Sequence, residues 1–321
     1  MPGGGGGRPV SGTLLEVRDL TVRYGAARGA LPAVDRVSFD LAEGETLGLV
    51  GESGCGKSTL ARALVGLAPI AAGTIRFAGI DVRSARGESL RTLRRSIQLV
   101  FQDPYGSLDP RQRVGAIVAE GIEIHRLARA EAVRERVARQ LVRVGLSPDC
   151  ADRWPHELSG GQRQRVGIAR ALAVEPRLLL CDEAVAALDV SIRGGILDLL
   201  LDLRERDGLA YLFISHDLAE VAAMSRRIAV MQLGELVEIG PARELLAAPR
   251  HPLTRAMLAS AAVARGEAPA APPLTGEPPS PSAPPSGCRF HPRCPLARPD
   301  CSRDAPPERA TADGWRWRCV E

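Results

Sequence analysis

Hydrophobic and polar residues alternate along two stretches near the N-terminus, and several later stretches are continuously apolar. The alternation at Leu14–Tyr24 and Arg36–Leu41 predicts an antiparallel strand pair with Val37, Phe39 and Leu41 on its buried side. Continuously apolar runs of this kind are typical of strands buried on both faces of a parallel sheet. We predict such strands at 46–50, 178–181 and 211–214, and further short strands at 74–77, 96–101, 228–231 and 236–239.

Helical spacing appears in the intervening segments. Val133, Val137, Leu141 and Val144 recur at steps of three and four residues, which predicts a core-facing helix. An Ala/Leu-rich helix is predicted at 60–67, directly after the apolar run 46–50, and another helix between Ser159 and Pro176.

Composition limits the class of protein. The chain has 321 residues, 45% of them hydrophobic and 25% charged, as in soluble globular proteins of one large domain or two. A net charge of +4 creates no demand for nucleic acid as a partner. No run reaches the roughly 18 apolar residues of a membrane span, and residues 1–10 form a glycine tract without the apolar centre of a signal peptide. A cytosolic location follows, in which the seven cysteines are expected to be thiols or metal ligands.

The segment Gly51–Ser58 fits the phosphate-loop pattern G-x-x-x-x-G-K-[ST] between a predicted strand and a predicted helix. Its glycines let backbone N–H groups surround a phosphate, and the helix start adds its positive end. Lys57 is the single lysine among 42 basic residues, so it occurs only where a compact ammonium suits the outer phosphates. Ser58 is expected to bind Mg²⁺. The predicted nucleotide-binding residues here are Gly51, Ser53, Gly54, Cys55, Gly56, Lys57, Ser58 and Thr59.

Polar residues follow two of the buried strands. Asp182 and Glu183 end one strand, and ligands bind at the carboxyl edge of a parallel sheet. Asp182 suits Mg²⁺ coordination, and Glu183 suits orienting or deprotonating a water that attacks the γ-phosphate. His216 follows the next strand, and its place at the same edge favours a phosphate contact over a helix-capping role.

Two further positions admit an ordinary structural explanation when each is taken alone. Gln102 follows the strand 96–101 in a Pro- and Gly-containing loop and would by default be a solvated residue. Ser159 precedes Gly160 and Gly161 at a helix start, which is either a capped surface helix or a second anion-binding site. The two glycines favour the second interpretation, because glycine in a first turn destabilises the helix.

Composition changes again at 262–287, where Ala, Pro, Ser and Gly predict a linker. Four of the seven cysteines follow within 32 residues: Cys288, Cys294, Cys301 and Cys319. Clustered thiols in a segment too small for its own core suggest a metal or iron–sulfur centre. Their spacing is not the paired C-x₂-C of common zinc modules, and zinc through His291 or unligated thiols remain alternatives.

With these motifs in place, the chain resembles the ATP-binding cassette (ABC) ATPases over roughly Leu14–Pro249. The resemblance implies an α/β fold of the P-loop NTPase class, with a RecA-like parallel core, an antiparallel β subdomain and a helical subdomain at about 103–176. It implies a disordered tail at 1–13, a cassette at 14–249, and an extension at 250–321 that contains the linker and a cysteine cluster at 288–319.

The resemblance also implies roles for particular residues. Gly51–Ser58 is similar to Walker A, Leu178–Asp182 to Walker B, Leu158–Gln162 to the LSGGQ signature, and Ala187–Asp189 to the D-loop. ATP would lie between one subunit's Walker A and the other's signature in a head-to-tail dimer. The implied catalytic residues are Glu183, His216 and Gln102, and the implied Mg²⁺ ligands are Ser58, Gln102 and Asp182. Further nucleotide contacts are implied for Tyr24 (the adenine-stacking aromatic), Ser159, Gly160, Gly161, Gln162 and Asp189.

Three segments, at 100–111, 251–255 and 287–295, resemble the dipeptide/oligopeptide/nickel importer ATPases. Such proteins hydrolyse ATP at the cytoplasmic face of the cell membrane to drive uptake. Their partners are a second ABC ATPase, two transmembrane permeases and an extracytoplasmic peptide-binding protein, and their tail cysteines are similar to ligands of a [4Fe–4S] cluster. Alternatives are import of nickel or another small solute, a soluble ABC ATPase acting in translation or DNA repair, and a redox-sensing tail.

The chain departs from the family pattern beside the predicted catalytic glutamate. Ala184 and Ala186 stand where the family usually has proline and serine. The charged groups are unchanged, but the turn loses rigidity and one polar contact. We expect an altered rate of hydrolysis and no loss of it.

Overall fold

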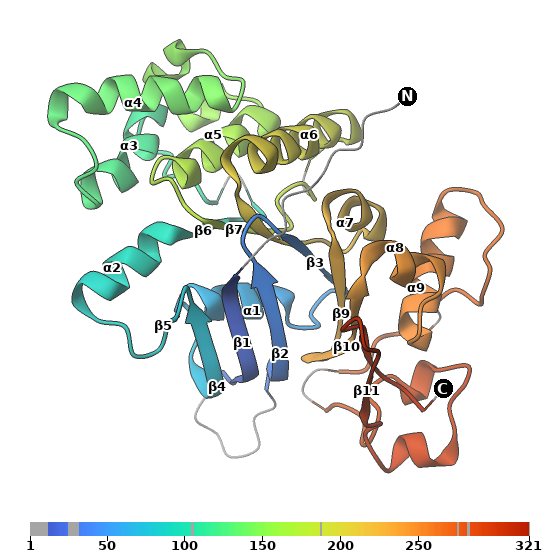
Figure 1. Ribbon diagram of the computed structural model, residues 1–321. Coiled ribbons are helices and arrows are strands. Elements are labelled where there is room, and N and C mark those ends of the chain that lie inside the picture. The colour runs from blue at the N-terminus through green and yellow to red at the C-terminus, as the bar shows by residue number, and fades with distance from the viewer. Residues whose placement is uncertain are drawn as a thin grey trace, which may run out of the picture.

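The computed structural model describes residues 12–24, 32–103, 106–186, 188–274, 276–280 and 283–320. Two β-sheets and the helices around them make up this part of the chain (Figure 1). The predicted tail at 1–13 lies almost wholly outside the described residues, as do Pro104, Tyr105 and Ala187.

The larger sheet is parallel at its centre and antiparallel at one edge. Its strand order is β11-β12-β10-β9-β3-β8-β7-β6. The strands β3, β6, β7, β8 and β9 pair in parallel, whereas β10, β11 and β12 pair antiparallel. The strands are β3 (Thr46–Gly51), β6 (Ile97–Val100), β7 (Leu178–Asp182), β8 (Ala210–Ile214), β9 (Arg227–Gln232), β10 (Glu235–Pro241), β11 (Glu308–Ala310) and β12 (Arg316–Arg318).

Alternate residues of the central strands face two separate hydrophobic cores. Leu179 and Cys181 of β7 pack into one core, and Leu178 and Leu180 into the other. All four are fully buried, as the uninterrupted apolar run predicts for a strand covered on both faces. Because β3, β8 and β7 are parallel neighbours, their carboxyl ends meet at one edge of the sheet. The polar residues predicted to bind the nucleotide follow these strand ends.

The smaller sheet is antiparallel and has the order β2-β1-β4-β5. It consists of β1 (Thr13–Val22), β2 (Val34–Ala42), β4 (Ile70–Phe77) and β5 (Ile80–Asp81). The predicted pairing of β1 with β2 is confirmed, and Val37, Phe39 and Leu41 are buried together. The predicted extension of β1 to Tyr24 is wrong, because the strand ends at Val22 and leaves Tyr24 48% exposed.

Helices surround the larger sheet, with α3, α4 and α5 grouped at one end of the molecule and α9 at the other (Figure 1). The helix predicted from Val133 to Val144 is confirmed as α4, with Val137, Leu141 and Val144 buried. The α-helices are α1 (Lys57–Leu64), α2 (Gly87–Ser96), α3 (Val114–Ile124), α4 (Ala130–Arg143), α5 (Gly160–Leu172), α6 (Val190–Asp207), α7 (Leu218–Met224), α8 (Ala242–Ala247) and α9 (Pro252–Ala264), and the 3₁₀ helices are η1 (Pro148–Asp152), η2 (Pro155–Glu157), η3 (His291–Arg293) and η4 (Pro299–Ser302).

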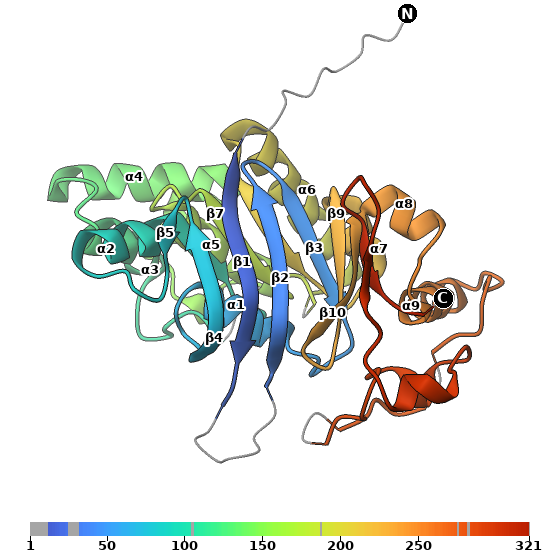
Figure 2. The ribbon, with the colours of Figure 1, turned by 60° about the horizontal axis from the view of Figure 1, so that its bottom comes forward.

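The C-terminal segment packs against the rest of the chain. α9 extends two residues beyond the start of the predicted linker, to Ala264, and the described residues from 265 to 290 contain neither helix nor strand. The hairpin β11–β12 then joins the larger sheet beside β10 (Figure 2). Trp317 lies opposite Glu238, and Arg316 lies opposite Ile239 of β10. Within the described ranges, every helix is too short or too polar to cross a membrane.

Candidate nucleotide-binding and hydrolysis site

The phosphate loop connects β3 to α1 in a conformation that needs glycine. A methyl group at position 51 would lie 2.3 Å from the Met231 carbonyl oxygen, and one at position 56 would lie 2.2 Å from the Ala33 carbonyl oxygen. Gly56 also has φ of +111°, and Gly54 has φ of +76° with open space around it. The loop therefore forms the backbone cradle, at a helix start, that a phosphate requires.

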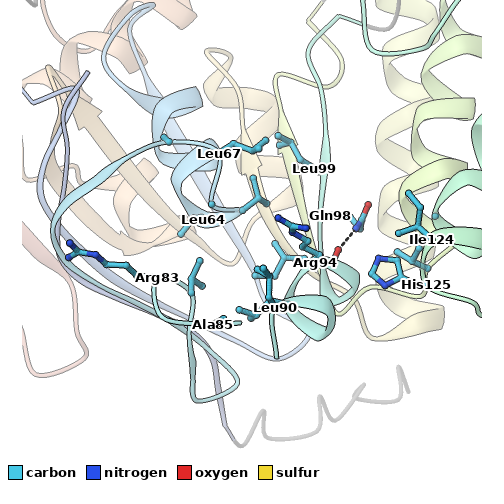
Figure 3. Close-up of a pocket in the computed structure, with 18 of the residues that line it drawn as sticks. Leu64, Leu67, Arg83, Ala85, Leu90, Arg94, Gln98, Leu99, Ile124 and His125 are labelled. Atoms are coloured by element: carbon cyan, nitrogen blue, oxygen red, sulfur yellow. Dashed lines mark hydrogen bonds between the residues drawn. The ribbon is translucent and has the colours of Figure 1, made fainter. Parts of the chain in front are cut away.

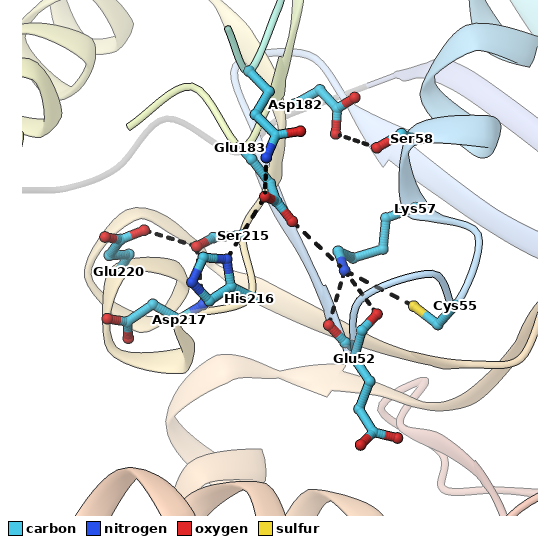
Figure 4. A network of polar contacts seen from close by, with 12 residues as sticks. Glu52, Cys55, Lys57, Ser58, Asp182, Glu183, Ser215, His216, Asp217 and Glu220 are labelled. Atoms are coloured by element: carbon cyan, nitrogen blue, oxygen red, sulfur yellow. Dashed lines mark hydrogen bonds and ion pairs between the residues drawn. The ribbon is translucent and has the colours of Figure 1, made fainter. Parts of the chain in front are cut away.

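Lys57 connects this loop to the end of β7. Its side chain is only 4% exposed, and its Nζ donates to the carbonyl oxygens of Gly51 at 2.8 Å and Glu52 at 3.1 Å. The same Nζ lies 3.8 Å from Glu183 Oε1 and 4.0 Å from the Sγ of the buried Cys55 (Figure 4). The one lysine thus lies between the loop and the carboxylate edge of the sheet.

Asp182 and Ser58 present oxygen atoms side by side. Ser58 Oγ donates to Asp182 Oδ1 at 3.0 Å (Figure 4). Burial raises the pKa of Asp182, and the hydrogen bond from Ser58 opposes that shift. A cation at this position would favour the ionised carboxylate, so the pair fits the hard oxygen ligands that Mg²⁺ prefers.

Glu183 lies at the centre of the predicted catalytic residues. Its backbone φ is +47°, an uncommon conformation for a residue with a side chain. Gln102 Nε2 donates to Glu183 Oε2 at 2.8 Å. His216 Nδ1 lies 3.7 Å from the same oxygen, and Figure 4 shows His216 beside Glu183. Gln102, predicted as a Mg²⁺ ligand as well as a catalytic residue, contacts Glu183, whereas Ser58 and Asp182 contact each other.

The signature segment forms the N-terminus of α5. Ser159 Oγ accepts from the Gln162 N–H, and Gln162 Oε1 accepts from the Ser159 N–H, which is a complete capping box. No hydrogen bond joins residues 159–162 to residues 51–59, all of which the structure describes. The remaining predicted residues lie apart: Ser53 is exposed in the loop, Thr59 lies in the first turn of α1, Asp189 is exposed before α6, and Tyr24 is exposed after β1.

A polar network that the sequence did not reveal lies next to His216 in the chain. Ser215 Oγ donates to Glu220 Oε2 at 2.7 Å, and Arg193 Nη1 donates to Glu220 Oε1 at 3.0 Å. Arg193 also donates to the Leu188 carbonyl oxygen at 3.2 Å. Ser215, the neighbour of His216 in the chain, is therefore connected through Glu220 and Arg193 to the segment before α6. The sequence offers one signal for Glu220, its position four residues after His216. That spacing does not distinguish a glutamate that supports the site from a charged residue on the surface of a helix.

The segment after β10 is held in place by a buried carboxylate of that strand, a contact that the sequence did not reveal. Glu238 is 1% exposed, and its two oxygens accept from the N–H groups of Arg250 and His251, from Thr254 Oγ1, and from Trp315 Nε1. His251 caps α9 by accepting from the Leu253 N–H, and burial lowers the pKa of His251 to about 3. Glu238 therefore binds the start of α9 and the C-terminal hairpin to β10.

The four tail cysteines lie in one small region of the extension. Burial raises the pKa of Cys288 to about 11, and the nearby Cys301, Cys294 and Cys319 contribute to that shift. Cys301 and Cys319 are buried, and the Cys288 N–H donates to the Cys301 carbonyl oxygen at 2.8 Å. Among the described residues, no three Cys, His, Asp or Glu side chains are arranged as a metal site. The predicted [4Fe–4S] cluster thus has its thiols in one place but no assembled ligand set.

A groove of about 740 Å³ lies between the α1–α2 region and the helices α3 and α5 (Figure 3). Leu67, Ile124 and Phe101 line it and are 66%, 63% and 38% exposed. Its charged lining residues are Arg83, Arg86, Arg94, Glu120 and Arg170. Such a concentration of exposed apolar side chains is typical of an interaction surface.

Comparisons with known proteins agree with this site. Residues 34–186 match the family described as "ABC transporter", and residues 237–301 match "Oligopeptide/dipeptide transporter, C-terminal region". The chain is 49% identical to "Probable peptide ABC transporter ATP-binding protein y4tS" of Sinorhizobium fredii, over 97% of this chain and 90% of that protein. It is 47% identical to "Oligopeptide transport ATP-binding protein AppF" of Bacillus subtilis, over 92% and 93%. The solved dimer of the cassette MJ0796, bound to ADP and Pi, superposes with a TM-score of 0.63 at 29% identity, over 71% of this chain and 99% of that one.

Proposed function

The chain belongs to the ATP-binding proteins of the peptide branch of the ABC transporters, and from this premise we propose that it hydrolyses ATP to energise uptake of dipeptides or oligopeptides. The observation that carries the proposal is the convergence of Lys57, Gln102 and His216 on Glu183 beside the phosphate loop. The peptide specificity is supported by the matching C-terminal region and by the names of the relatives.

Hydrolysis requires a held triphosphate and a positioned water. We infer that the backbone of 51–58 and Lys57 hold the phosphates, and that Ser58 and Asp182 hold Mg²⁺, which supplies charge neutralisation at the phosphate oxygens. Glu183 orients and deprotonates the attacking water. Gln102 and His216 fix the Glu183 carboxylate, and His216 also donates to the γ-phosphate. Tyr24 stacks on the adenine, for which its exposed ring is available.

The site needs a second subunit. Since Ser159, Gly160, Gly161 and Gln162 make no hydrogen bond to their own phosphate loop, we propose that they contact the γ-phosphate held by a second cassette, with Asp189 at the same interface. The capped, glycine-containing start of α5 is suited to bind an anion. The dimeric ADP- and Pi-bound cassette supports this arrangement. Ala184 and Ala186 should alter the rate of hydrolysis through the flexibility of their turn.

The apolar groove is the proposed docking site for a permease subunit, which would place the chain on the cytoplasmic face of the membrane. The exposed Leu67 and Ile124 of the groove provide the apolar contact. The arginines of the groove favour a permease segment with acidic residues at the edge of that contact. Leu67→Arg or Ile124→Arg should abolish co-purification with the two permeases. Val142→Arg, at an apolar residue 59% exposed on α4 and outside the groove, is the matched control.

Uptake of a labelled peptide tests the function as a whole. A host lacking this chain should lose ATP-dependent peptide uptake, and the wild-type chain should restore it where Glu183→Gln does not. Uptake of an unrelated amino acid is the control. Normal peptide uptake without the chain, together with loss of nickel uptake, would replace the proposal by the nickel alternative. A peptide-binding protein outside the membrane is the remaining proposed partner.

We also propose that Cys288, Cys294, Cys301 and Cys319 close around a [4Fe–4S] cluster when it is inserted. Their grouping, which the effect of Cys294, Cys301 and Cys319 on the pKa of Cys288 reflects, supports four-thiolate ligation. Anaerobically prepared protein should contain about four iron and four sulfide per chain, by the composition of the cluster. Stoichiometric zinc without sulfide would assign the thiols to a structural zinc site instead.

A further inference from the structure

The C-terminal extension reaches the phosphate loop directly. Arg293 Nη1 donates to both carboxylate oxygens of Glu52, at 2.9 and 2.7 Å, and the two side chains are only 7% and 16% exposed. Glu52 is the second residue of the phosphate loop, and its carboxylate points away from Lys57 (Figure 4). An ion pair so shielded from water interacts far more strongly than one at the surface.

The backbone of Glu52 belongs to the loop's own hydrogen-bond system. Its carbonyl oxygen accepts from Lys57 Nζ at 3.1 Å and from the Cys55 N–H at 3.2 Å. The orientation of the Glu52 side chain and the position of Lys57 are therefore coupled through one residue. A contact that fixes the side chain also fixes the carbonyl that positions the lysine.

A second arginine of the same segment supports the loop indirectly. Arg289 donates to the Leu233 carbonyl oxygen and pairs with Asp35 and Glu235. The next residue, Gly234, donates from its N–H to the Cys55 carbonyl oxygen at 2.7 Å. The segment Cys288–Cys294 thus contacts the loop directly through Arg293 and, through Arg289 and the β9–β10 turn, indirectly.

The segment that carries both arginines is itself well anchored. Phe290 is 1% exposed and lies against His251, with ring centroids 5.8 Å apart. Its turn is closed by the hydrogen bonds from the His291 and Cys294 N–H groups to the carbonyl oxygens of Cys288 and His291. The segment 288–294 therefore holds Arg289 and Arg293 in place and does not depend on the phosphate loop for its own position.

From these contacts we propose that Arg293 is a positioning residue for ATP binding, which sets nucleotide affinity by holding the Glu52 carboxylate away from the phosphates. Without Arg293, Glu52 is an uncompensated carboxylate beside an anion site, and it competes with the phosphates for Lys57. The segment 288–294 is thereby coupled to the nucleotide, and the coupling is reciprocal: bound ATP stabilises the segment. The proposal requires ATP binding at this loop but not that the transported solute be a peptide.

Binding of ATP with Mg²⁺ to the full-length chain, measured by calorimetry, tests this role. Arg293→Gln should raise the Kd roughly tenfold, within the usual range of coupling between sites, and Arg293→Lys should restore most of the affinity. Glu52→Gln/Arg293→Gln should bind ATP more tightly than Arg293→Gln alone, because no unpaired carboxylate remains. In steady-state hydrolysis the loss should appear in KM rather than in kcat.

The matched control is Arg303→Gln in the same extension, whose side chain is 71% exposed and pairs with Asp300. It should bind ATP as the wild type does. Wild-type affinity in folded Arg293→Gln, or equal weakening in the single and double variants, would overturn the proposal. Should Arg293→Gln not fold, hydrogen exchange of the unaltered chain decides: amides of 288–294 should exchange more slowly with ATP, and unchanged exchange refutes the coupling. Normal peptide uptake in a host that lacks the chain, with these ATP-binding responses intact, would refute the proposed function alone.

Discussion

Removal of the Glu238 carboxylate should detach the C-terminal region from the sheet. Glu238 is 1% exposed, and it accepts hydrogen bonds from four donors: two backbone N–H groups at 250 and 251, Thr254 Oγ1, and Trp315 Nε1. Glu238→Ala leaves all four donors without this acceptor, three of them in fully buried hydrogen bonds. The lost hydrogen bonds all lie where α9 and the β11–β12 hairpin contact β10.

The magnitude follows from the number of donors. Each hydrogen bond to a charged group contributes about 1.5–3 kcal/mol, but four bonds to one carboxylate are not additive. We expect Glu238→Ala to lower the free energy of unfolding by about 4 kcal/mol, near the upper end for a single substitution. Glu238→Gln keeps one acceptor oxygen and should cost about 2 kcal/mol, and Thr254→Val removes one donor and should cost about 1 kcal/mol.

Urea unfolding followed by tryptophan fluorescence measures this series. Trp315 is 5% exposed and bonded to Glu238, so its emission reports the release of the hairpin. Glu238→Ala should give a separate early transition with red-shifted emission, and proteolysis of the native protein should cleave beyond residue 250. Equal unfolding midpoints for Glu238→Ala and Thr254→Val would refute the assignment of Glu238 as the common acceptor.

Three further predictions concern the site and its surroundings. Glu183→Gln should bind ATP but hydrolyse it roughly 10²- to 10⁴-fold more slowly, and brisk turnover in a phosphate-release assay would remove Glu183 from its role. Ser159→Ala should cost about 1 kcal/mol in stability and reduce hydrolysis by the dimer without changing ATP binding to a single chain, so wild-type turnover would contradict a role across the dimer. The pKa of about 3 for buried His251 means that the unfolded chain alone takes up this proton, so stability should fall by about 1.4 kcal/mol per pH unit from about pH 6.5 toward pH 3. His251→Asn keeps a helix-capping acceptor but has no imidazole to protonate, so its stability should not show this pH dependence. Equal pH slopes of the unfolding free energy for the wild type and His251→Asn, measured in urea, would contradict the prediction.

Much of the fold can be predicted from the sequence, because the patterns that indicate its strands, helices and phosphate loop involve residues close together in the chain. The phosphate loop has fixed spacing between a strand and a helix, and the structure places that loop between β3 and α1 as predicted. The alternation before Leu41 and the apolar run before Asp182 each determine which faces a strand buries. For the same reason Ser159 could be predicted as a cap, since a capping box needs only residues three apart.

Polar contacts between residues far apart in the sequence cannot be predicted in this way. Glu52 and Arg293 are far apart in sequence, and nothing in either neighbourhood indicates that they meet. Strand β12 has three residues, two of them arginines around Trp317, so no period-2 pattern predicted that it would extend the main sheet. The extension was accordingly expected to follow a linker as a separate segment, whereas it packs on β10 and on the phosphate loop.

The nearly complete replacement of lysine by arginine has a practical consequence. Apart from the chain's amino terminus, Lys57 carries the single primary amine in the protein, and it is 4% exposed inside the phosphate loop. An amine-selective acylating reagent therefore has one side-chain amine to modify, and a triphosphate bound in the loop should protect that amine from the reagent. The protein thus contains its own chemical reporter of nucleotide occupancy, with no engineered label.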